Sequence, residues 1–328
     1  MIVNIIINLI YTLLHSKGVI RMNNVFLEEI KDWETWGKVF QSIPAFEKLI
    51  AKIFEKESLN FKDISHLTAG SNAVFKVDNF VVKIFAPIES GFNTEIDYNS
   101  EILGMKRAID LDINIPNIVA ASFIKDKYLF NYIIMDYIEG KDAKDVLRHY
   151  SAGQKVEFVR QLKENISKMN TKFEGSYPAF DMKERILTNT RWNELNNKIV
   201  TQVKELVSSY DMQNKVYVHG DITSENVMLT QNGMFYIIDF ADSRIAPKEY
   251  ELPPILFDLF DFDKIMINEF IDGQDIESFV EKCFYGILMH EFGFYFVKLI
   301  CERVIGKDAI ELSDILEIKE ALLQLFTK

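Results

Sequence analysis

Two neighbouring segments of the chain carry side chains suited to phosphoryl chemistry. The first segment, Val216–Leu229, contains Asp221 and Asn226, and the second, Phe235–Phe240, contains Asp239. Phosphoryl transfer needs a carboxylate beside the attacking hydroxyl, and oxygen ligands for the magnesium that neutralises the nucleotide phosphates. Asp221, Asn226 and Asp239 are residues of these types, so the two segments predict a phosphotransferase active site.

The spacing of these residues and the sequence around them support this interpretation. Asn226 follows Asp221 by five positions, in the order His-x-Asp-x-x-x-x-Asn that protein kinases and their small-molecule kinase relatives use. Apolar strands are expected at Lys215–Val218 and Val227–Thr230, and a turn then leads to a third strand that ends near Asp239. The alternative is that these side chains only cap a turn and end a strand. The strands on both sides of the motif favour the active site.

An upstream lysine fits the same chemistry. The region before it predicts a three-stranded antiparallel meander, with strands at Phe61–Leu67, Ala73–Val77 and Phe80–Phe85. Lys83 lies in the third strand between bulky apolar residues, where a buried cation needs an anion. The α- and β-phosphates of a nucleotide would supply that anion, and the turn with Gly70 and Ser71 would cover them. The alternative is an edge-strand lysine that points to solvent.

A helix is expected next, at Thr94–Leu111, with an apolar stripe made of Tyr98, Ile102, Met105 and Ile109. In kinases this position belongs to the helix whose glutamate orients the phosphate-binding lysine. Glu95 and Glu101 flank the stripe at similar angles, so periodicity does not choose between them.

A hinge between two lobes is expected at residues 135–140. The apolar strand of Tyr128–Tyr137 runs into an acidic turn that ends at Gly140. Backbone groups near Met135 and Tyr137 would then face the adenine of the nucleotide. A plain loop between a strand and a helix is the alternative.

With these motifs in place, the chain resembles the aminoglycoside phosphotransferase family of the protein-kinase-like superfamily, from about Phe61 to about Phe260. His219-Gly-Asp-Ile-Thr-Ser-Glu-Asn226 is similar to the family's first signature, and Ile238-Asp-Phe240 to its metal-binding signature. The resemblance implies ATP or GTP as donor and Mg²⁺ as cofactor. The roles that it implies are a catalytic base at Asp221, magnesium ligands at Asn226 and Asp239, a phosphate anchor at Lys83 with Glu101 as its partner, and loop support from His219.

Several features differ from ordinary protein kinases and favour a small hydroxylated acceptor over a protein. Gly220 replaces the arginine before the base, so a phosphorylated activation loop has no obvious arginine to engage. No Gly-x-Gly-x-x-Gly occurs in the first hairpin, and no Ala-Pro-Glu follows the second signature. Glu251 stands where the small-molecule kinases usually have an aspartate, a departure that could alter a structural hydrogen bond. A protein kinase and a nucleotide-binding regulatory pseudoenzyme remain the alternative functions.

The composition bounds the partners. The 328 residues are 48% hydrophobic, and the formal net charge is −12, which argues against nucleic-acid binding. An acidic surface would favour cationic acceptors such as aminoglycosides or amino alcohols, although many acidic cytosolic proteins bind no cation. Acids of the second lobe are candidates for the acceptor pocket or for a solvated face: Asp258, Asp261, Asp263, Glu269 and Asp272. Cys283 and Cys301 lie in apolar segments and suggest a reduced, cytoplasmic protein.

The first 21 residues form an apolar leader, whose apolar run at Ile2–Leu14 is too short for a spanning helix and which lacks the features of a secretory signal. Met22 is the expected start of translation, and a weak membrane anchor is the less favoured alternative. Residues 22–57 are expected to form two amphipathic helices, broken at Pro44, that extend the first lobe.

The fold expected from these elements is α+β and two-lobed, of the protein-kinase-like type. An antiparallel sheet lobe at residues 58–139 would bind the nucleotide, and a larger, mainly helical lobe at residues 140–328 would hold the catalytic residues and the acceptor. Helical patterns in the second lobe cover Gln154–Phe173, Trp192–Tyr210, Ile255–Phe270, Ile276–Val304 and Ile310–Phe326. The fourth of these is rich in aromatic residues, which either line an acceptor pocket or fill the core.

Overall fold

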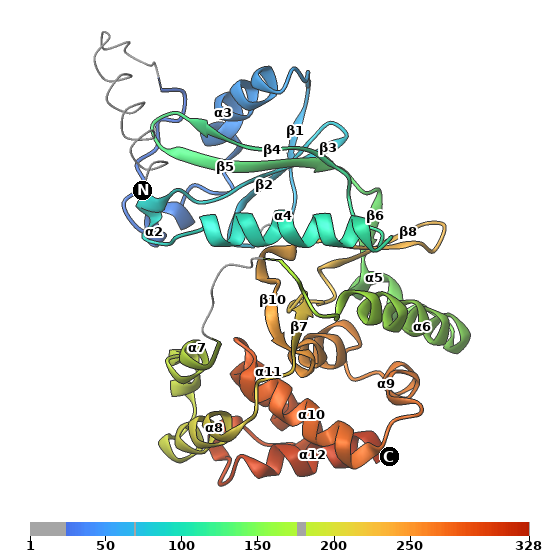
Figure 1. Cartoon of the computed structure of the whole chain (residues 1–328). Coiled ribbons are helices and arrows are strands. Elements are labelled where there is room, and N and C mark those ends of the chain that lie inside the picture. Colours follow the sequence, from blue (N-terminus) through green and yellow to red (C-terminus); the bar gives the residue numbers. More distant parts are fainter. Residues whose placement is uncertain (1–23, 69, 176–181, 328) are drawn as a thin grey trace. The chain divides into compact units, whose positions relative to one another are not determined.

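The computed structural model describes residues 24–68, 70–175 and 182–327 (Figure 1). The expected leader and Ala69 lie outside the described residues. The chain forms two compact units, and Ser122–Tyr132 belongs to the first unit together with the residues up to Phe92. The second unit holds Asn93–Ala121 and everything from Ile133 onward. The expected α+β architecture is confirmed, but the segment 93–121 groups with the larger, helical unit, whereas the sequence assigned it to the sheet lobe.

The chain forms a five-stranded antiparallel sheet with the strand order β1-β2-β3-β5-β4, of which β1, β2 and β3 belong wholly to the first unit and β4 and β5 in part. Its β2–β3 hairpin turns tightly at Asp78, which takes a left-handed φ of 52°, and pairs Val77 with Phe80 and Val74 with Lys83. This register leaves Lys83 one residue from the end of its strand. The strands are β1 (Ile64–His66), β2 (Ala73–Val77), β3 (Phe80–Ile84), β4 (Ile118–Lys125) and β5 (Leu129–Asp136).

Two helices precede this sheet, α2 (Trp33–Gly37) and α3 (Ile43–Lys56). The Ser42 side chain caps α3, and Pro44 lies in its first turn, where a missing amide hydrogen costs nothing. On the buried face of α3, the Phe46 ring contacts aromatic rings from segments that precede and follow the helix in the sequence. These neighbours are Phe26, Trp36, Phe75 and Phe130. The aromatic cluster holds the helices to the sheet.

The start of the described chain is also fixed to the sheet. The buried carboxylate of Asp126, in the β4–β5 turn, accepts the amides of Val25 and Phe26 at 3.0 Å each. Lys52 of α3 completes the contact at 2.8 Å. The predicted helical extension is therefore part of the first unit.

Helices dominate the second unit, and two small sheets lie among them. β7 pairs with β10, and β8 lies between β6 and β9. No helix in the described part of the chain is long and apolar enough to span a bilayer. The helices are α4 (Glu95–Asp110), α5 (Ala143–Leu147), α6 (Ala152–Met169), α7 (Met182–Leu187), α8 (Asn197–Ser209), α9 (Lys264–Ile271), α10 (Ile276–Met289), α11 (Gly293–Ile300) and α12 (Leu316–Thr327). The strands are β6 (Gly140–Asp142), β7 (Lys215–Val218), β8 (Val227–Thr230), β9 (Phe235–Ile237) and β10 (Arg244–Pro247).

The prediction of a single helix at Ile276–Val304 is wrong, because the helix is interrupted between α10 and α11. His290 has an extended backbone, and its ring nitrogen Nδ1 accepts the Phe292 amide at 3.1 Å. Gly293 then passes so close to the Ile287 carbonyl that a Cβ would lie 2.0 Å from it. The helix expected at Ile255–Phe270 is also interrupted, by a short π-helical turn before α9.

The buried face of α4 also differs from the expected apolar stripe. Its buried residues are Ser100, Glu101, Gly104, Met105 and Ala108. Ile109, which the stripe included, is exposed. α4 turns its small residues toward the segment after Asp239, and Gly104 has no room for a Cβ: one would lie 2.7 Å from Phe240 and 2.5 Å from the Tyr217 hydroxyl.

Replacing Gly104 by alanine should therefore destabilise the protein by about 1–3 kcal/mol, because the added methyl group must displace packed side chains. Gly153→Ala is the matched control in α6, since a Cβ there meets nothing within 4 Å. It should be neutral or slightly stabilising. Urea unfolding of both variants checks this, and equal effects would contradict the close approach at Gly104.

Candidate active site

The loop between β7 and β8, residues 219–226, is compact because its own backbone bonds close it. The Thr223 amide donates to the Asp221 carbonyl at 2.9 Å, and the Asn226 amide donates to the Thr223 carbonyl at 3.2 Å. Ile238, the residue after β9, donates its amide to the Asn226 carbonyl at 3.0 Å. These bonds bring Asp221, Asn226 and the segment of Asp239 together.

Asp221 and Asn226 are joined by a direct side-chain contact. Asn226 Nδ2 donates to Asp221 Oδ2 at 2.7 Å and to the Asp221 carbonyl at 2.9 Å. The amide nitrogen is thereby committed to Asp221, and the amide oxygen is the atom that Asn226 can offer to another group. The contact also fixes the orientation of the Asp221 carboxylate.

The surroundings of Asp221 are acidic. Burial raises the pKa of Asp221 well above its usual value, and the carboxylates of Asp242, Asp239 and Asp258 raise it further. The hydrogen bond from Asn226 acts in the opposite direction. Several carboxylates that repel one another form a site that favours a bound cation.

Asp239 lies at a sharp bend of the backbone. Its φ of 63° and ψ of 71° are left-handed values, which aspartate tolerates better than most residues, and its side chain is exposed. A 3₁₀ turn, Phe240–Asp242, follows directly. The bend separates the direction of the Asp239 carboxylate from that of the strand before it.

His219 connects the loop to this bend. Its Nδ1 accepts the Asp221 amide at 3.3 Å, so its Nε2 carries the proton and donates to the Ile238 carbonyl at 3.2 Å. The ring also contacts Phe240, with 4.6 Å between the ring centroids. His219 thus contacts both segments through backbone groups.

Glu251, which is 1% exposed, binds the backbone of the loop. Its Oε2 accepts the His219 amide at 2.8 Å, and its Oε1 accepts the Gly220 amide at 3.0 Å. Burial raises the pKa of Glu251 to about 7, although these two bonds favour the ionised form. The glutamate that departs from the family's aspartate therefore reaches two backbone donors at once.

Gly220 is required by both its conformation and its neighbours. Its φ is +82°, and a Cβ would lie 3.0 Å from the Asp242 carbonyl and 3.2 Å from the Tyr250 ring. Arg244 lies beside it and donates from Nε to the Asp242 carbonyl at 2.8 Å. The guanidinium beside residue 220 therefore belongs to β10 and not to the position before Asp221. It is paired with Asp242 and Glu291.

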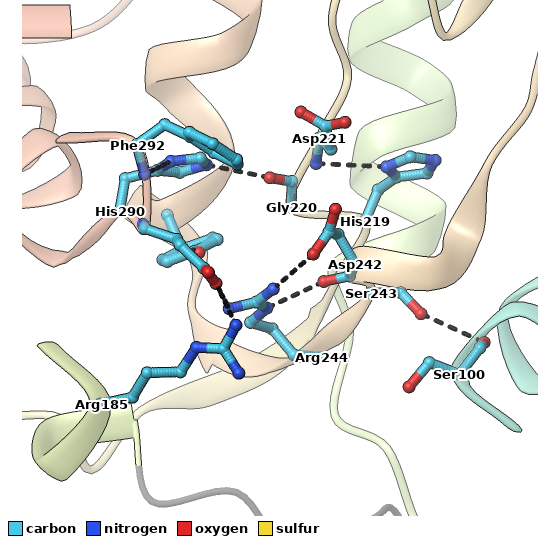
Figure 2. A network of polar contacts seen from close by, with 12 residues as sticks. Ser100, Arg185, His219, Gly220, Asp221, Asp242, Ser243, Arg244, His290 and Phe292 are labelled. Atoms are coloured by element: carbon cyan, nitrogen blue, oxygen red, sulfur yellow. Dashed lines mark hydrogen bonds and ion pairs between the residues drawn. The ribbon is translucent and has the colours of Figure 1, made fainter. Parts of the chain in front are cut away.

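His290 reaches the same loop from the break between α10 and α11 (Figure 2). Its Nε2 bonds the Gly220 carbonyl at 2.9 Å. Burial lowers the pKa of His290 to about 3, with a further contribution from the positive charge of Arg244, so the ring is neutral at physiological pH.

The residues predicted to bind the nucleotide are divided between the two units. Lys83, Gly70 and Ser71 belong to the first unit. Lys83 is 4% exposed in β3, and the Trp36 indole fixes the exposed turn by donating to the Ser71 carbonyl at 2.9 Å. Of the two candidate glutamates in α4, Glu95 is exposed.

Glu101, Met135 and Tyr137 belong to the second unit. Glu101 is 1% exposed. Met135 is buried near the end of β5, and Tyr137 follows the strand. Asn117 steadies this segment, because its carbonyl accepts the Asp136 amide at 3.0 Å.

The acids that were candidates for the acceptor pocket are mostly committed elsewhere. Asp258 accepts the Ser224 amide and hydroxyl at 2.8 Å each, and so supports the loop. Asp263 caps α9 and pairs with Lys155, Glu269 pairs with Arg160, and Asp261 pairs with Arg303. Phe279, Phe284 and Phe296 of α10 and α11 are core residues, whereas Tyr295 is 44% exposed and Phe292, just before α11, is 38% exposed.

Sequence reasoning missed Arg244 and the role of His290. Both act across long stretches of sequence, so no local spacing could reveal them. One signal was present: His290 and Glu291 interrupt an otherwise apolar helical pattern just before Gly293. Such an interruption is a reason to expect a break in the helix.

Glu251→Gln should lower the free energy of unfolding by about 1–3 kcal/mol, because the amide nitrogen of glutamine opposes one of the two buried backbone donors. Glu249→Gln, on the same 3₁₀ turn but at a more exposed position, is the control. It should stay within about 0.5 kcal/mol of the wild type. Guanidinium unfolding near neutral pH measures both, and a neutral Glu251→Gln would contradict this role.

Acid should destabilise the protein through His290. The folded state keeps this ring neutral, with a pKa of about 3, while the unfolded chain takes up a proton below the ordinary value of 6.5. Between about pH 7.5 and pH 5 the free energy of unfolding of the wild type should fall by about 2 kcal/mol more than that of His290→Gln, because the glutamine at position 290 does not titrate. Urea unfolding at both pH values measures this difference. Parallel losses in the two proteins would refute it.

Comparison with known proteins agrees with the fold and the motifs. The phosphotransferase enzyme family, abbreviated APH, matches residues 68–277. The structure is similar to the GDP complex of wild-type aminoglycoside 2'-phosphotransferase-IIIa, at 17% identity and a TM-score of 0.59, over 87% of this chain and 99% of that chain. No curated protein sequence matches the chain.

Two further solved structures share the fold. The streptomycin-ATP-APH(2")-IIa ternary complex matches at 15% identity and a TM-score of 0.54, over 80% of this chain and 96% of that chain. LicA in complex with AMP matches at 13% identity and a TM-score of 0.51, over 85% of this chain and 97% of that chain. Since the family match spans well over half of the sequence and these structures share the fold, the chain belongs to the aminoglycoside phosphotransferase (APH) family of phosphotransferase enzymes.

Proposed function

We propose that this protein transfers the γ-phosphate of ATP or GTP to a hydroxyl group of a small molecule, with Asp221 as the base. The class of enzyme, a small-molecule phosphotransferase that binds a nucleotide, follows from the family. The acceptor class that we propose is an aminoglycoside-like antibiotic, or an amino alcohol or sugar metabolite. One solved relative binds streptomycin, an aminoglycoside, together with ATP, which supports an acceptor of the first kind.

The observation that carries this proposal is the contact between Asp221 and Asn226. At 2.7 Å, the asparagine amide holds the carboxylate in one orientation. In phosphoryl transfer the protein contributes mainly positioning and charge neutralisation, so an oriented carboxylate beside the acceptor hydroxyl is the part that the chemistry needs. Asp221 would orient that hydroxyl and accept its proton.

The donor set around Asp221 fits magnesium. Asn226 would offer its amide oxygen, since its nitrogen is committed to Asp221, and Asp239 would offer its exposed carboxylate. Among the described residues, no group of three or more histidine, cysteine or acidic side chains is arranged to hold a metal. Magnesium in nucleotide sites uses one or two protein ligands and completes its shell with phosphates and water. Bound there, the metal would neutralise the charge of the phosphates.

Residues of both units would contribute to nucleotide binding. We propose that Lys83 binds the α- and β-phosphates, that Glu101 orients this lysine, and that the turn of Gly70 and Ser71 covers the phosphates. Met135 and Tyr137 would present backbone groups to the base. GDP and ATP in solved relatives support a nucleotide donor of either kind.

The cytoplasm is the compartment that we propose. Cys283 and Cys301 are both buried and unpaired, which suits a reducing environment.

The proposal predicts magnesium-dependent turnover of ATP or GTP that one acceptor stimulates, in a panel of aminoglycosides, macrolides, amino alcohols and sugars. Asp221→Asn should lower kcat by about 10²- to 10⁴-fold, the range for a lost general base. Asp239→Ala should abolish the magnesium-dependent reaction. Asp261→Asn is the control, because Asp261 is also an aspartate with positive φ but pairs with Arg303 at the surface.

The control should keep wild-type activity. Full activity in Asp239→Ala would refute the metal site, and full activity in Asp221→Asn would refute the base. Absence of any nucleotide turnover or nucleotide binding by the wild type would refute the proposed function itself.

A further inference from the structure

His290 and the 219–226 loop are linked by a bond between distant parts of the second unit (Figure 2). The His290 imidazole is 2% exposed, and its Nδ1 accepts the Phe292 amide at 3.1 Å. The proton is therefore on Nε2, which donates to the Gly220 carbonyl at 2.9 Å. The ring has one tautomer and one direction, both set by the chain itself.

Packing holds the His290 ring in this position. It stacks on the Tyr250 ring at 4.4 Å and 25°, and it meets the edge of Phe296 at 5.2 Å. A buried ring held on two sides has little freedom to rotate away from its acceptor. Its hydrogen bond is therefore geometrically specific.

The carbonyl that His290 holds belongs to the peptide bond leading into Asp221. The amide of that same peptide, on Asp221, donates to Nδ1 of His219 at 3.3 Å. Two imidazoles thus bind the oxygen and the nitrogen of a single peptide plane, His290 from the turn between α10 and α11 and His219 from the loop itself. Because Gly220 has a φ of +82° and no side chain to restrain it, this plane needs external support.

The local structure around His290 agrees with such a role. The helix is interrupted at this residue, and Gly293 accepts a close approach to Ile287 so that the turn can form. An uninterrupted helix would direct residue 290 elsewhere. The break places the imidazole against the loop, while Glu291 beside it pairs with Arg185 and Arg191 and fixes the turn.

We propose that His290 is a positioning residue for the base: it holds the peptide between Gly220 and Asp221, and so sets the direction of the Asp221 carboxylate. This inference rests on the proposed function of Asp221 for its catalytic consequence. The structural part of the inference, that His290 supports the loop, does not depend on the activity.

The test uses three variants of the full chain. His290→Phe keeps a buried ring but removes the donor, whereas His290→Gln retains an amide donor near the place of Nε2. Cys283→Ala is the control for simple destabilisation, because Cys283 is buried in the same helix, α10, but precedes the break that places His290. The melting temperature of each variant shows how much stability is lost.

Activity is measured as the ADP that forms from ATP in the presence of magnesium and the acceptor that the panel identifies. We expect His290→Phe to lower kcat by about 10- to 100-fold, the effect of a small misplacement of a catalytic group, with KM for ATP unchanged within about twofold. His290→Gln should recover kcat to within about threefold of the wild type. Cys283→Ala should leave kcat unchanged at temperatures where it is folded.

A second readout does not depend on turnover. Amide hydrogen exchange of peptides covering residues 217–226 should become faster in His290→Phe and stay close to wild type in His290→Gln and Cys283→Ala. Unchanged exchange in His290→Phe, or equal behaviour of the Phe and Gln variants, would overturn the inference. If the wild type shows no phosphotransfer while exchange changes as expected, the proposed function fails and the loop-supporting role of His290 stands.

Discussion

The structure of the candidate active site depends on one constraint: the backbone of residues 219–221 is largely buried, so its polar groups need partners that no helix or sheet provides. Glu251 accepts two of its amides, His219 accepts a third, and His290 donates to a carbonyl. An unpaired buried amide or carbonyl costs about as much as a whole hydrogen bond contributes. Side chains therefore define the shape of the loop, and the loop defines where Asp221 points.

This constraint accounts for features that otherwise look like irregularities. The break between α10 and α11, the glycine at 220 and the glutamate at 251 each serve to bring a partner to the loop or to make room for one. α4 contributes in the same way, since Gly104 lets the helix lie against Phe240 and thus supports the bend at Asp239.

Much of the architecture could be predicted from the sequence, because it depends on local patterns. Strands such as Ala73–Val77 and Val227–Thr230 have alternating side-chain patterns and are bounded by tight turns. Asp221 and Asn226 meet because a loop of few residues joins them. The buried face of α4 could not be predicted, because small residues buried by close packing carry no hydrophobic signal while the exposed Ile109 does. The contacts of Glu251 and His290 with the loop follow only from tertiary packing.

The bond from His290 spans 70 residues of sequence, and those from Glu251 span 31 and 32. Contacts of such separation carry a loop-closure entropy cost, and they form only after both partners have been synthesised. The geometry at Asp221 is consequently among the last properties that the chain acquires during synthesis, when α10 and the turn after it have emerged and docked. Chains released before residue 290 would carry every motif of the enzyme without its assembled active site.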